Sequence, residues 1–319
     1  MPWLALRQGE CQRAGPSCRH SSATRHRDTP GTRRHTVTHR LRSGPVPPRE
    51  GVGVSQIPTV TFLRSQLRRA RQGRGLSQEE LGRLINYSSS QVSAIETGDR
   101  PVNPDYLARV DAALDTGGLF VAMLELIRFH AAPDWFRPWE EIEREATALR
   151  WYEANAVPGL LQTEGYARAM LGVGGELTAE EIEARVVARL ARQSLLTGDP
   201  RPQLVAVLEE QALRRQVGDR SVMRDQMAHL LAVGAEPNVH VRVVPAASPW
   251  HTGLGGSFIL ARLDGGAELA YLDNQLRGQT VDAPNDVAAL GRRWESVTGE
   301  ALPRRQSARL IEEVAKTWT

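Results

Sequence analysis

The residues from Leu76 to Arg100 constrain this chain most, because they carry the start signals of two short helices on either side of a turn. Residues 77–80 and 88–91 each place a serine three positions before a glutamate or glutamine, which is the spacing of a capping box. Asn86 stands between the two predicted helices, and asparagine tolerates the left-handed conformation that a tight reversal requires. The stretch therefore predicts a helix, a turn and a second helix.

Apolar residues recur on the inner face of each predicted helix: Leu81, Leu84, Ile85, Val92 and Ile95. The second helix is left with small outward residues, namely Ser89, Ser90, Ser93 and Ala94. A second helix with a small polar outer face, held across the first by an apolar seam, is the geometry of a helix-turn-helix that enters the DNA major groove. The alternative is an ordinary helical hairpin in a core, since amphipathic helix pairs are common.

Residues 76–81 (LSQEEL) and 91–98 (QVSAIETG) resemble the helix-turn-helix of phage-repressor (XRE-type) proteins. In that family the residue matching Gln78 holds a phosphate, and residues matching Ser89, Ser90, Ser93 and Ala94 face the bases. The family also pairs an arginine of the preceding helix with a glutamate of the recognition helix, which implies a structural ion pair between Arg71 and Glu96.

From this resemblance we expect Gln78 and the start of the recognition helix at Ser88 to hold phosphates of double-stranded DNA. Ser89, Ser90, Ser93 and Ala94 are expected to set the sequence preference. Because such short side chains give weak direct readout, specificity is expected to depend partly on DNA shape or on Arg100 reaching the backbone.

The flanking sequence extends the predicted DNA-binding domain over residues 56–130. A helix is expected from Phe62 to about Gln72, with Leu63, Leu67 and Ala70 inward and Arg64, Arg68 and Arg69 outward. Asn103 and Pro104 are typical of a further helix start. The apolar run 119–127 is too short to span a bilayer, and we interpret it as the last helix of the domain.

Composition sets wider limits on the class of protein. At 319 residues the chain is long enough for two domains. Lys316 is the only lysine, so the abundant arginine is not by itself evidence of nucleic-acid chemistry. A pI near 9.2 permits a polyanionic partner, but the net charge of +3 is small, so the position of the charge matters more than its total. The only cysteines are Cys11 and Cys18, which fits a reducing cytoplasm, and no secretion signal or membrane partner is expected.

Residues 1–55 are expected to form a disordered, arginine-rich tail, because they contain few apolar residues. Two interpretations stay open: a basic arm that adds nonspecific DNA affinity, or a mis-assigned start codon with the true start near Val52 or Val54. Cys11, Cys18, His20 and His26 have no standard zinc-finger spacing, so no metal site is expected there.

Residues 131–319 form the second predicted domain. Four short aliphatic runs separated by turns predict a small sheet, over residues 203–208, 239–244, 257–261 and 268–272. Helices are predicted over residues 140–153, 176–196, 284–298 and 306–317. The expected fold is therefore mainly α with a small sheet: an all-α helix-turn-helix domain followed by an α+β domain.

The second predicted domain shows no convincing active site. Glu209 and Glu210 follow a predicted strand, but carboxylates in that position are usually solvated or paired. His251 lies beside three glycines whose spacing matches no phosphate-binding loop. His229 and His240 belong to no motif. We therefore expect no catalytic residue, no metal and no cofactor, and an enzyme remains only a remote alternative.

Several motifs of this domain resemble a large actinobacterial family: residues 135–139, 143–146, 151–153, 157–164, 166–169 and 209–215. Its members join an XRE-type domain to a long C-terminal domain of unknown function, and they are described as antitoxin-like transcriptional regulators. With the first domain, the resemblance covers about Phe62 to Val314, and it implies a small companion protein encoded by a neighbouring gene. The tail before Val54 departs from the family pattern.

The sequence thus predicts a cytoplasmic, sequence-specific DNA-binding regulator. A homodimer is expected because one recognition helix contacts only a short half-site, with the interface either at residues 119–129 or in the second domain. The C-terminal domain is expected to bind the companion protein or, alternatively, to sense a small molecule. An exposed aromatic groove would favour the companion, and a closed apolar cavity with a few polar groups would favour the small molecule. The residues that would form either site are Trp135, Trp139, Trp151 and Tyr166.

Overall fold

The computed structural model describes residues 59–274 and 276–318, which belong to one compact unit. The predictions for the tail over residues 1–55, its start codon and its Cys and His residues lie outside the described residues. The boundary expected near residue 130 stays a prediction, because both halves of the described chain fall in the same unit. None of the helices in the two described ranges combines the length and apolar character that a membrane crossing needs.

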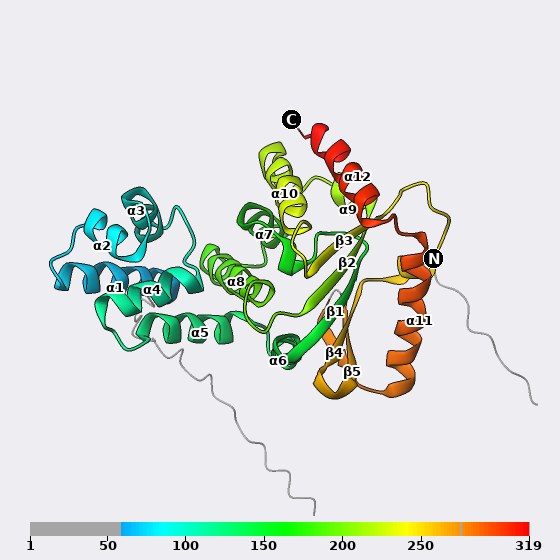
Figure 1. Cartoon of the computed structure of the whole chain (residues 1–319), viewed down its shortest axis with the longest axis horizontal. Coiled ribbons are helices and arrows are strands. Elements are labelled where there is room, and N and C mark those ends of the chain that lie inside the picture. Colours follow the sequence, from blue (N-terminus) through cyan, green and yellow to red (C-terminus); the bar gives the residue numbers. More distant parts are fainter. Residues whose placement is uncertain (1–58, 275, 319) are drawn as a thin grey trace, which may run out of the picture. The chain divides into compact units, whose positions relative to one another are not determined.

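The first half is a bundle of five helices (Figure 1). They are α1 (Thr59–Gly73), α2 (Gln78–Ile85), α3 (Ser89–Thr97), α4 (Pro104–Leu114) and α5 (Leu119–Ala131). Helices α2 and α3 are the predicted pair, and their contacts with α1 and α4 hold them across one another.

The local signals of the α2–α3 turn are confirmed. Capping boxes start α2 at Ser77 and α3 at Ser88, and Asn86 ends α2 in the left-handed region with φ 61°. Gly82 lets α2 pack closely against the turn, because a Cβ at this position would lie 2.5 Å from the carbonyl oxygen of Tyr87. These contacts fix the angle between the two helices through short-range geometry.

The core of this half confirms four of the five predicted seam residues. Leu81, Ile85, Val92 and Ile95 are at most 2% exposed, whereas the prediction for Leu84 is wrong, since it is 62% exposed. Arg64 was also expected to point outward, but its side chain is largely buried against Glu183. Val187 and Ala191, from the second half of the chain, complete this core.

The second half is an α+β fold. Its strands are β1 (Ala146–Glu153), β2 (Gln203–Glu209), β3 (Val239–Val244), β4 (Phe258–Leu263), β5 (Glu268–Asp273) and β6 (Gly278–Val281). Its α-helices are α6 (Arg137–Glu145), α7 (Glu164–Leu171), α8 (Ala179–Arg192), α9 (Glu210–Arg214), α10 (Arg220–Val233), α11 (Pro284–Glu300) and α12 (Arg304–Lys316). Both halves together give the predicted fold class.

The strands form one six-stranded sheet in the order β3-β2-β1-β4-β5-β6. Strands β1, β2 and β3 are parallel, and β4, β5 and β6 continue the sheet in antiparallel pairs. The four predicted strands are confirmed, and β1 and β6 were missed. The helix predicted over residues 140–153 is wrong beyond Glu145, because residues 146–153 form a central strand that pairs with β2 and β4, and Thr147, Trp151 and Tyr152 within it favour strands.

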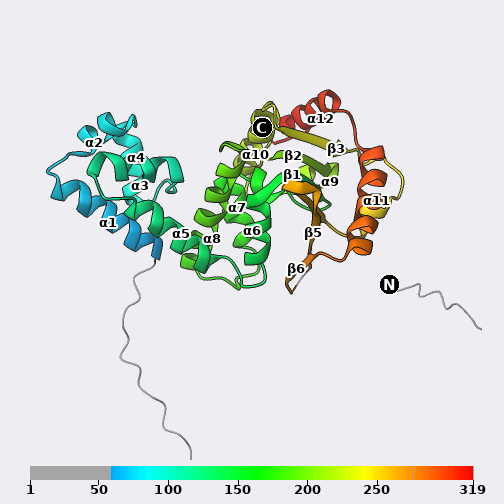
Figure 2. The same ribbon diagram turned by 60° about the horizontal axis from the view of Figure 1, so that its bottom comes forward.

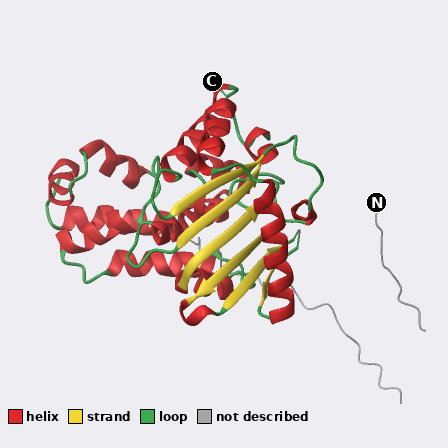
Figure 3. Ribbon diagram, turned by 45° about the vertical axis from the view of Figure 1, so that its right-hand side comes forward, coloured by secondary structure: helices red, strands yellow, loops and turns green. Residues whose placement is uncertain are grey.

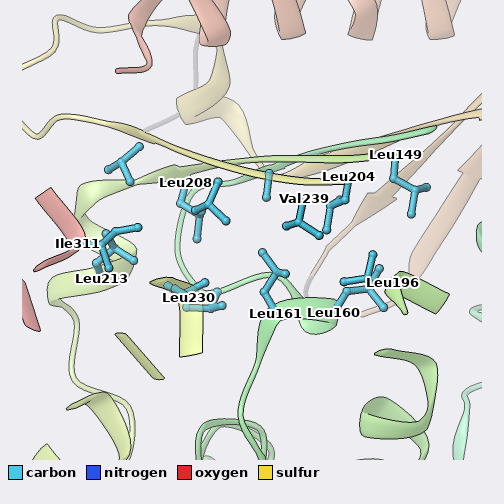
Figure 4. Close-up of a cluster of buried hydrophobic side chains, with 14 of the residues drawn as sticks. Leu149, Leu160, Leu161, Leu196, Leu204, Leu208, Leu213, Leu230, Val239 and Ile311 are labelled. Atoms are coloured by element: carbon cyan, nitrogen blue, oxygen red, sulfur yellow. The ribbon is translucent and has the colours of Figure 1, made fainter. Parts of the chain in front are cut away.

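Helices cover both faces of the sheet (Figure 3). On one face α11 packs Val287, Leu290, Trp294 and Val297 against the sheet. On the other face α10 and α12 close the larger core, in which Leu204, Leu208 and Val239 of the sheet face Leu161 and Leu230 (Figure 4). Because both faces are covered, the strands lack a clean apolar alternation.

Helix α8 joins the two halves. It contacts α1 and α5 of the first half and α7 of the second (Figure 2). Residues 184, 187 and 191 of α8 pack into the core of the first half, and Arg192 at its end pairs with Glu143 of α6. A single helix is therefore anchored by both parts of the described chain.

Candidate nucleic-acid interface

The outer face of α3 presents small side chains to solvent. Ser88, Ser89 and Ser90 are exposed, and Ser93 and Ala94 are half-buried one turn later. The Oγ atoms of Ser88 and Ser90 lie 2.9 Å apart, and the Ser88 Oγ also accepts from the amide of Gln91. The start of α3 thus offers an open surface with no bulky side chain to block a groove.

A buried ion pair fixes α3 on α1. Arg71 donates from Nε to Glu96 Oε1 at 2.7 Å and from Nη2 to Glu96 Oε2 at 2.9 Å, with the residues 7% and 3% exposed. Arg71 also donates from Nη1 to the carbonyl oxygen of Leu76 at 2.7 Å. The structure therefore brings together the two residues that the resemblance implied as a pair, and they hold the start of α2 as well.

Gln78 shares the same carboxylate. Its Nε2 donates to Glu96 Oε2 at 3.0 Å, and Arg68 donates to the Glu96 carbonyl oxygen at 2.9 Å. Burial alone would raise the pKa of Glu96, but the hydrogen bonds from Arg71 and Gln78 outweigh burial and lower it. Because an amide nitrogen carries two donors, the contact with Glu96 orients the Gln78 side chain and uses only one of them.

Cationic side chains flank this surface. Arg83 on α2 is exposed beside Glu79, and Arg100 is exposed just after α3, with its backbone amide bonded to the carbonyl oxygen of Ala94 at 2.9 Å. Arg68 is half exposed. Exposed arginines therefore lie on α1, on α2 and just after α3, beside the small side chains of α3.

The aromatic surface expected in the second half is not present. Trp139 and Tyr166 are fully buried, so their assignment to a partner or ligand surface is wrong. The Trp139 ring packs 5.2 Å from that of Tyr271, and the Tyr166 hydroxyl accepts from the amide of Val157. Both residues bury their rings in the main core, as large apolar side chains usually do. Trp151 is half-buried in β1.

Trp135 lies elsewhere, at the mouth of a cavity of about 170 Å³ between α8, the end of β5 and residues 131–136. Phe136, Arg189 and Tyr271 also line the cavity. Trp135 was predicted from the sequence, whereas the arginines of α8 were not. Their spacing at 185, 189 and 192 on one helix face was the available signal.

A buried polar cluster was also missed. Tyr152 donates to Glu209 Oε1 at 2.9 Å, and His251 Nε2 lies 3.1 Å from the same oxygen. Tyr152 and Glu209 come at the ends of adjacent parallel strands, and His251 comes from the segment after β3. Of the glycines beside His251, Gly253 serves close packing, since a Cβ there would lie 2.7 Å from the Tyr152 ring.

The other polar residues considered in the sequence are separate. Glu210 accepts from Arg214 at 2.6 Å and from the amide of Ala246 at 2.8 Å, which is a structural arrangement. His229 is half-buried on α10, and His240 is half-buried on β3. Within the part of the chain that the structure describes, no group of three His, Cys, Asp or Glu residues has the spacing to hold a metal ion.

Two family models match the chain. One, described as a helix-turn-helix domain, matches residues 63–121, and the other, described as a domain of unknown function (DUF5753), matches residues 136–313. The first range contains α2 and α3 together with Arg71 and Glu96. No curated protein and no solved structure matches the chain.

Proposed function

Since the chain belongs to the DUF5753 family and carries a helix-turn-helix domain before that region, we propose that it is a sequence-specific DNA-binding transcriptional regulator. One observation supports the proposal above the others: the Arg71–Glu96 pair holds α3 rigidly while Ser89 and Ser90 stay exposed. An ordinary core hairpin would bury that face. A DNA-binding one must leave it free for the major groove.

In the proposed complex α3 lies in the major groove, with Ser89, Ser90, Ser93 and Ala94 toward the base edges. The amide of Gln78 and the first turn of α3 at Ser88 bind phosphates, where backbone N–H groups favour an anion. Arg100 adds a backbone contact beyond the end of α3. Phosphate contacts set the register, and the small side chains and DNA shape set the preference.

We further propose that the regulator acts as a homodimer through α5. This helix exposes an apolar stripe of Leu119, Leu126 and Phe129, which are 51%, 58% and 54% exposed. Apolar patches of this kind mark interaction sites. A second copy seated on it would provide a second recognition helix for the other half-site.

The dimer proposal is tested by sedimentation velocity of the full chain. Leu126→Arg places a charge in the stripe and should convert a dimer to a monomer. Leu276→Arg is the matched control, since Leu276 is 90% exposed between β5 and β6 and should leave the mass unchanged. A monomeric wild-type chain, or dimers of equal strength in both variants, would refute the interface.

The antitoxin-like role and the companion protein are proposed from the family resemblance. With Trp139 and Tyr166 buried, we place the contact with such a partner at the segment between β3 and β4, where Trp250 is 83% exposed. Trp250→Ser should then abolish co-purification of the adjacent gene's product and leave DNA binding intact. Undiminished co-purification would show that Trp250 is not part of the contact with the companion protein.

The regulator itself is tested in cells by immunoprecipitating the chain with its bound DNA and sequencing the fragments. We expect a small set of enriched sites, including its own upstream region, that share one motif. The variant Ser90→Glu, which places a carboxylate on the groove-facing side, should lose them because it repels phosphates. Uniform recovery of the chromosome by both proteins would contradict the proposal.

A further inference from the structure

The cavity beside Trp135 has an aromatic wall. The rings of Trp135 and Phe136 meet edge to face at 6.0 Å, and those of Phe136 and Tyr271 at 5.5 Å. Arg192 lies over the Phe136 ring at 4.6 Å, which holds that ring in place. The wall is therefore packed into position before any ligand enters, so that little order has to be created on binding.

The opposite side of the cavity carries an excess of positive charge. Arg189 donates from Nη1 to Gln162 Oε1 at 2.6 Å, and neither Arg189 nor Arg185 forms an ion pair with a carboxylate anywhere in residues 59–274 or 276–318. By contrast, Arg192 is neutralised by Glu143 through two contacts of 2.9 Å. Glutamine orients the Arg189 guanidinium without cancelling its charge.

The acidic residues of the lining do not remove this excess. Glu140 lies 3.8 Å from Arg192, and burial raises its pKa. Asp273 is exposed at the end of β5 and forms no ion pair within the described residues, but its charge acts on Arg189 and offsets part of the excess. Burial and the neighbouring Arg192 and Arg185 outweigh Asp273 and lower the pKa of Arg189 to about 10. Because burial and the neighbouring arginines disfavour the charged form of Arg189, an anion bound beside it would stabilise that charge.

The cavity has room for one aromatic ring. Its volume is about 170 Å³, and a cavity of about 150 Å³ is enough to admit benzene. An arginine with fixed orientation binds planar anions through paired N–H groups. We propose that the cavity binds a small aromatic acid, with its ring against Trp135, Phe136 and Tyr271 and its carboxylate on Arg189.

Helix α8 connects this site to α3. One face of α8 supplies Arg185, Ala188 and Arg189 to the cavity, and another packs Val187 and Ala191 into the core of the helix-turn-helix half. From α8, Glu183 binds Arg64 of α1 at 2.6 Å. The Arg64 guanidinium in turn packs against the end of α3, since a Cβ at Gly98 would lie 2.9 Å from its Nη1.

The ligand is therefore an effector of DNA binding, an assignment that rests on the proposed regulator function. A shift of α8 on binding reaches the end of α3 through Arg64. By thermodynamic linkage, if the acid changes the affinity for DNA by some factor, DNA changes the affinity for the acid by the same factor. This reciprocity separates an effector from an unrelated binder.

The site is tested first, without DNA, by isothermal titration of the full chain with benzoate and with benzamide, its uncharged analogue. We expect saturable benzoate binding and at least tenfold weaker benzamide binding. Arg189→Gln should abolish benzoate binding, while Arg224→Gln, at an exposed arginine on α10, should leave it unchanged. Melting curves confirm that both variants are folded. Equal binding of both probes, unaltered binding by Arg189→Gln, or no saturable benzoate binding at millimolar concentration would overturn the site.

The effector role is tested by repeating a DNA titration with saturating benzoate. A change in DNA affinity of threefold or more, absent in Arg189→Gln, is expected. Benzoate binding with unchanged DNA affinity would overturn the effector role and leave the site standing. Failure of the regulator proposal has a different signature, because selective DNA binding would then be absent with and without benzoate.

Discussion

Arg64 of α1 and Glu183 of α8 lie 119 residues apart in sequence, and their side chains meet at 2.6 Å. Glu183 also accepts from Arg168 of α7 at 2.7 Å, so one carboxylate holds arginines from both halves of the described chain. All three side chains are at most 40% exposed. Through this carboxylate, α8 is attached to both the helix-turn-helix half and the second half.

The first prediction concerns this shared carboxylate. Glu183→Gln removes the negative charge with which both arginines pair. It should lower the free energy of unfolding by about 1 to 3 kcal/mol, the usual penalty for a poorly satisfied buried polar group. Urea unfolding followed by circular dichroism measures it. Glu180→Gln, at an exposed position on the same helix, should change the free energy of unfolding by less than about 0.5 kcal/mol. Equal effects of the two substitutions would show that the contact is not stabilising.

A second prediction concerns Glu96. Glu96→Gln should cost about 1 to 3 kcal/mol of unfolding free energy, because Arg71 loses its bidentate partner. The pKa of Glu96 is lowered from its ordinary value of 4.5, so its contribution is fully present above about pH 4.5 and is lost as the pH falls through the folded pKa. Unfolding free energies measured from pH 3 to pH 7 should converge at low pH for the wild type and the variant. A constant difference, or the same loss in the exposed Glu79→Gln, would contradict the pairing.

Glu153, at the end of β1, gives a third prediction. Its pKa is raised and not lowered, so it makes stability fall with increasing pH. Its Oε2 is buried with no hydrogen-bond partner among the described residues, and burial raises its pKa to about 7, although a hydrogen bond with Ser257 opposes this. Between pH 4.5 and about 7 the folded state then binds one more proton than the unfolded state. Stability should fall by about 1.4 kcal/mol per pH unit across this window.

The variant Glu153→Gln removes that titration. It should flatten the slope and make the protein more stable than the wild type at pH 8, as measured by urea unfolding at pH 5 to pH 8. A variant that keeps the wild-type slope would assign the titration to another group.

The helix-turn-helix was predictable because its signals are local. The capping boxes at residues 77–80 and 88–91 and the left-handed Asn86 each depend on neighbours within four positions. The prediction for Leu84 was wrong because spacing alone did not identify the inner face of α2, which consists of Leu81, Gly82 and Ile85 and leaves Leu84 62% exposed. Propensity and pattern describe a helix, and packing decides which of its faces is covered.

The second half was less predictable because its features depend on contacts between distant residues. Strand β1 mixes helix formers such as Ala148 and Leu149 with strand formers such as Trp151 and Tyr152, and it becomes central only when β2 and β4 pair with it. Trp139 and Tyr166 were assigned to a surface because aromatic residues serve cores and interfaces equally well. The cavity escaped notice because Arg189 meets Trp135 only after α8 docks beside residues 131–136.

The central claim is tested most directly by fluorescence anisotropy of the purified chain on a labelled duplex from its own upstream region, against a shuffled duplex of the same composition. We expect at least tenfold tighter binding to the upstream duplex, weakened by added salt as phosphate contacts require, and loss of that preference in Ser90→Glu. The control Ala247→Glu, in the exposed segment after β3, should bind like the wild type. Equal affinity for both duplexes, or none for either, would contradict a sequence-specific regulator.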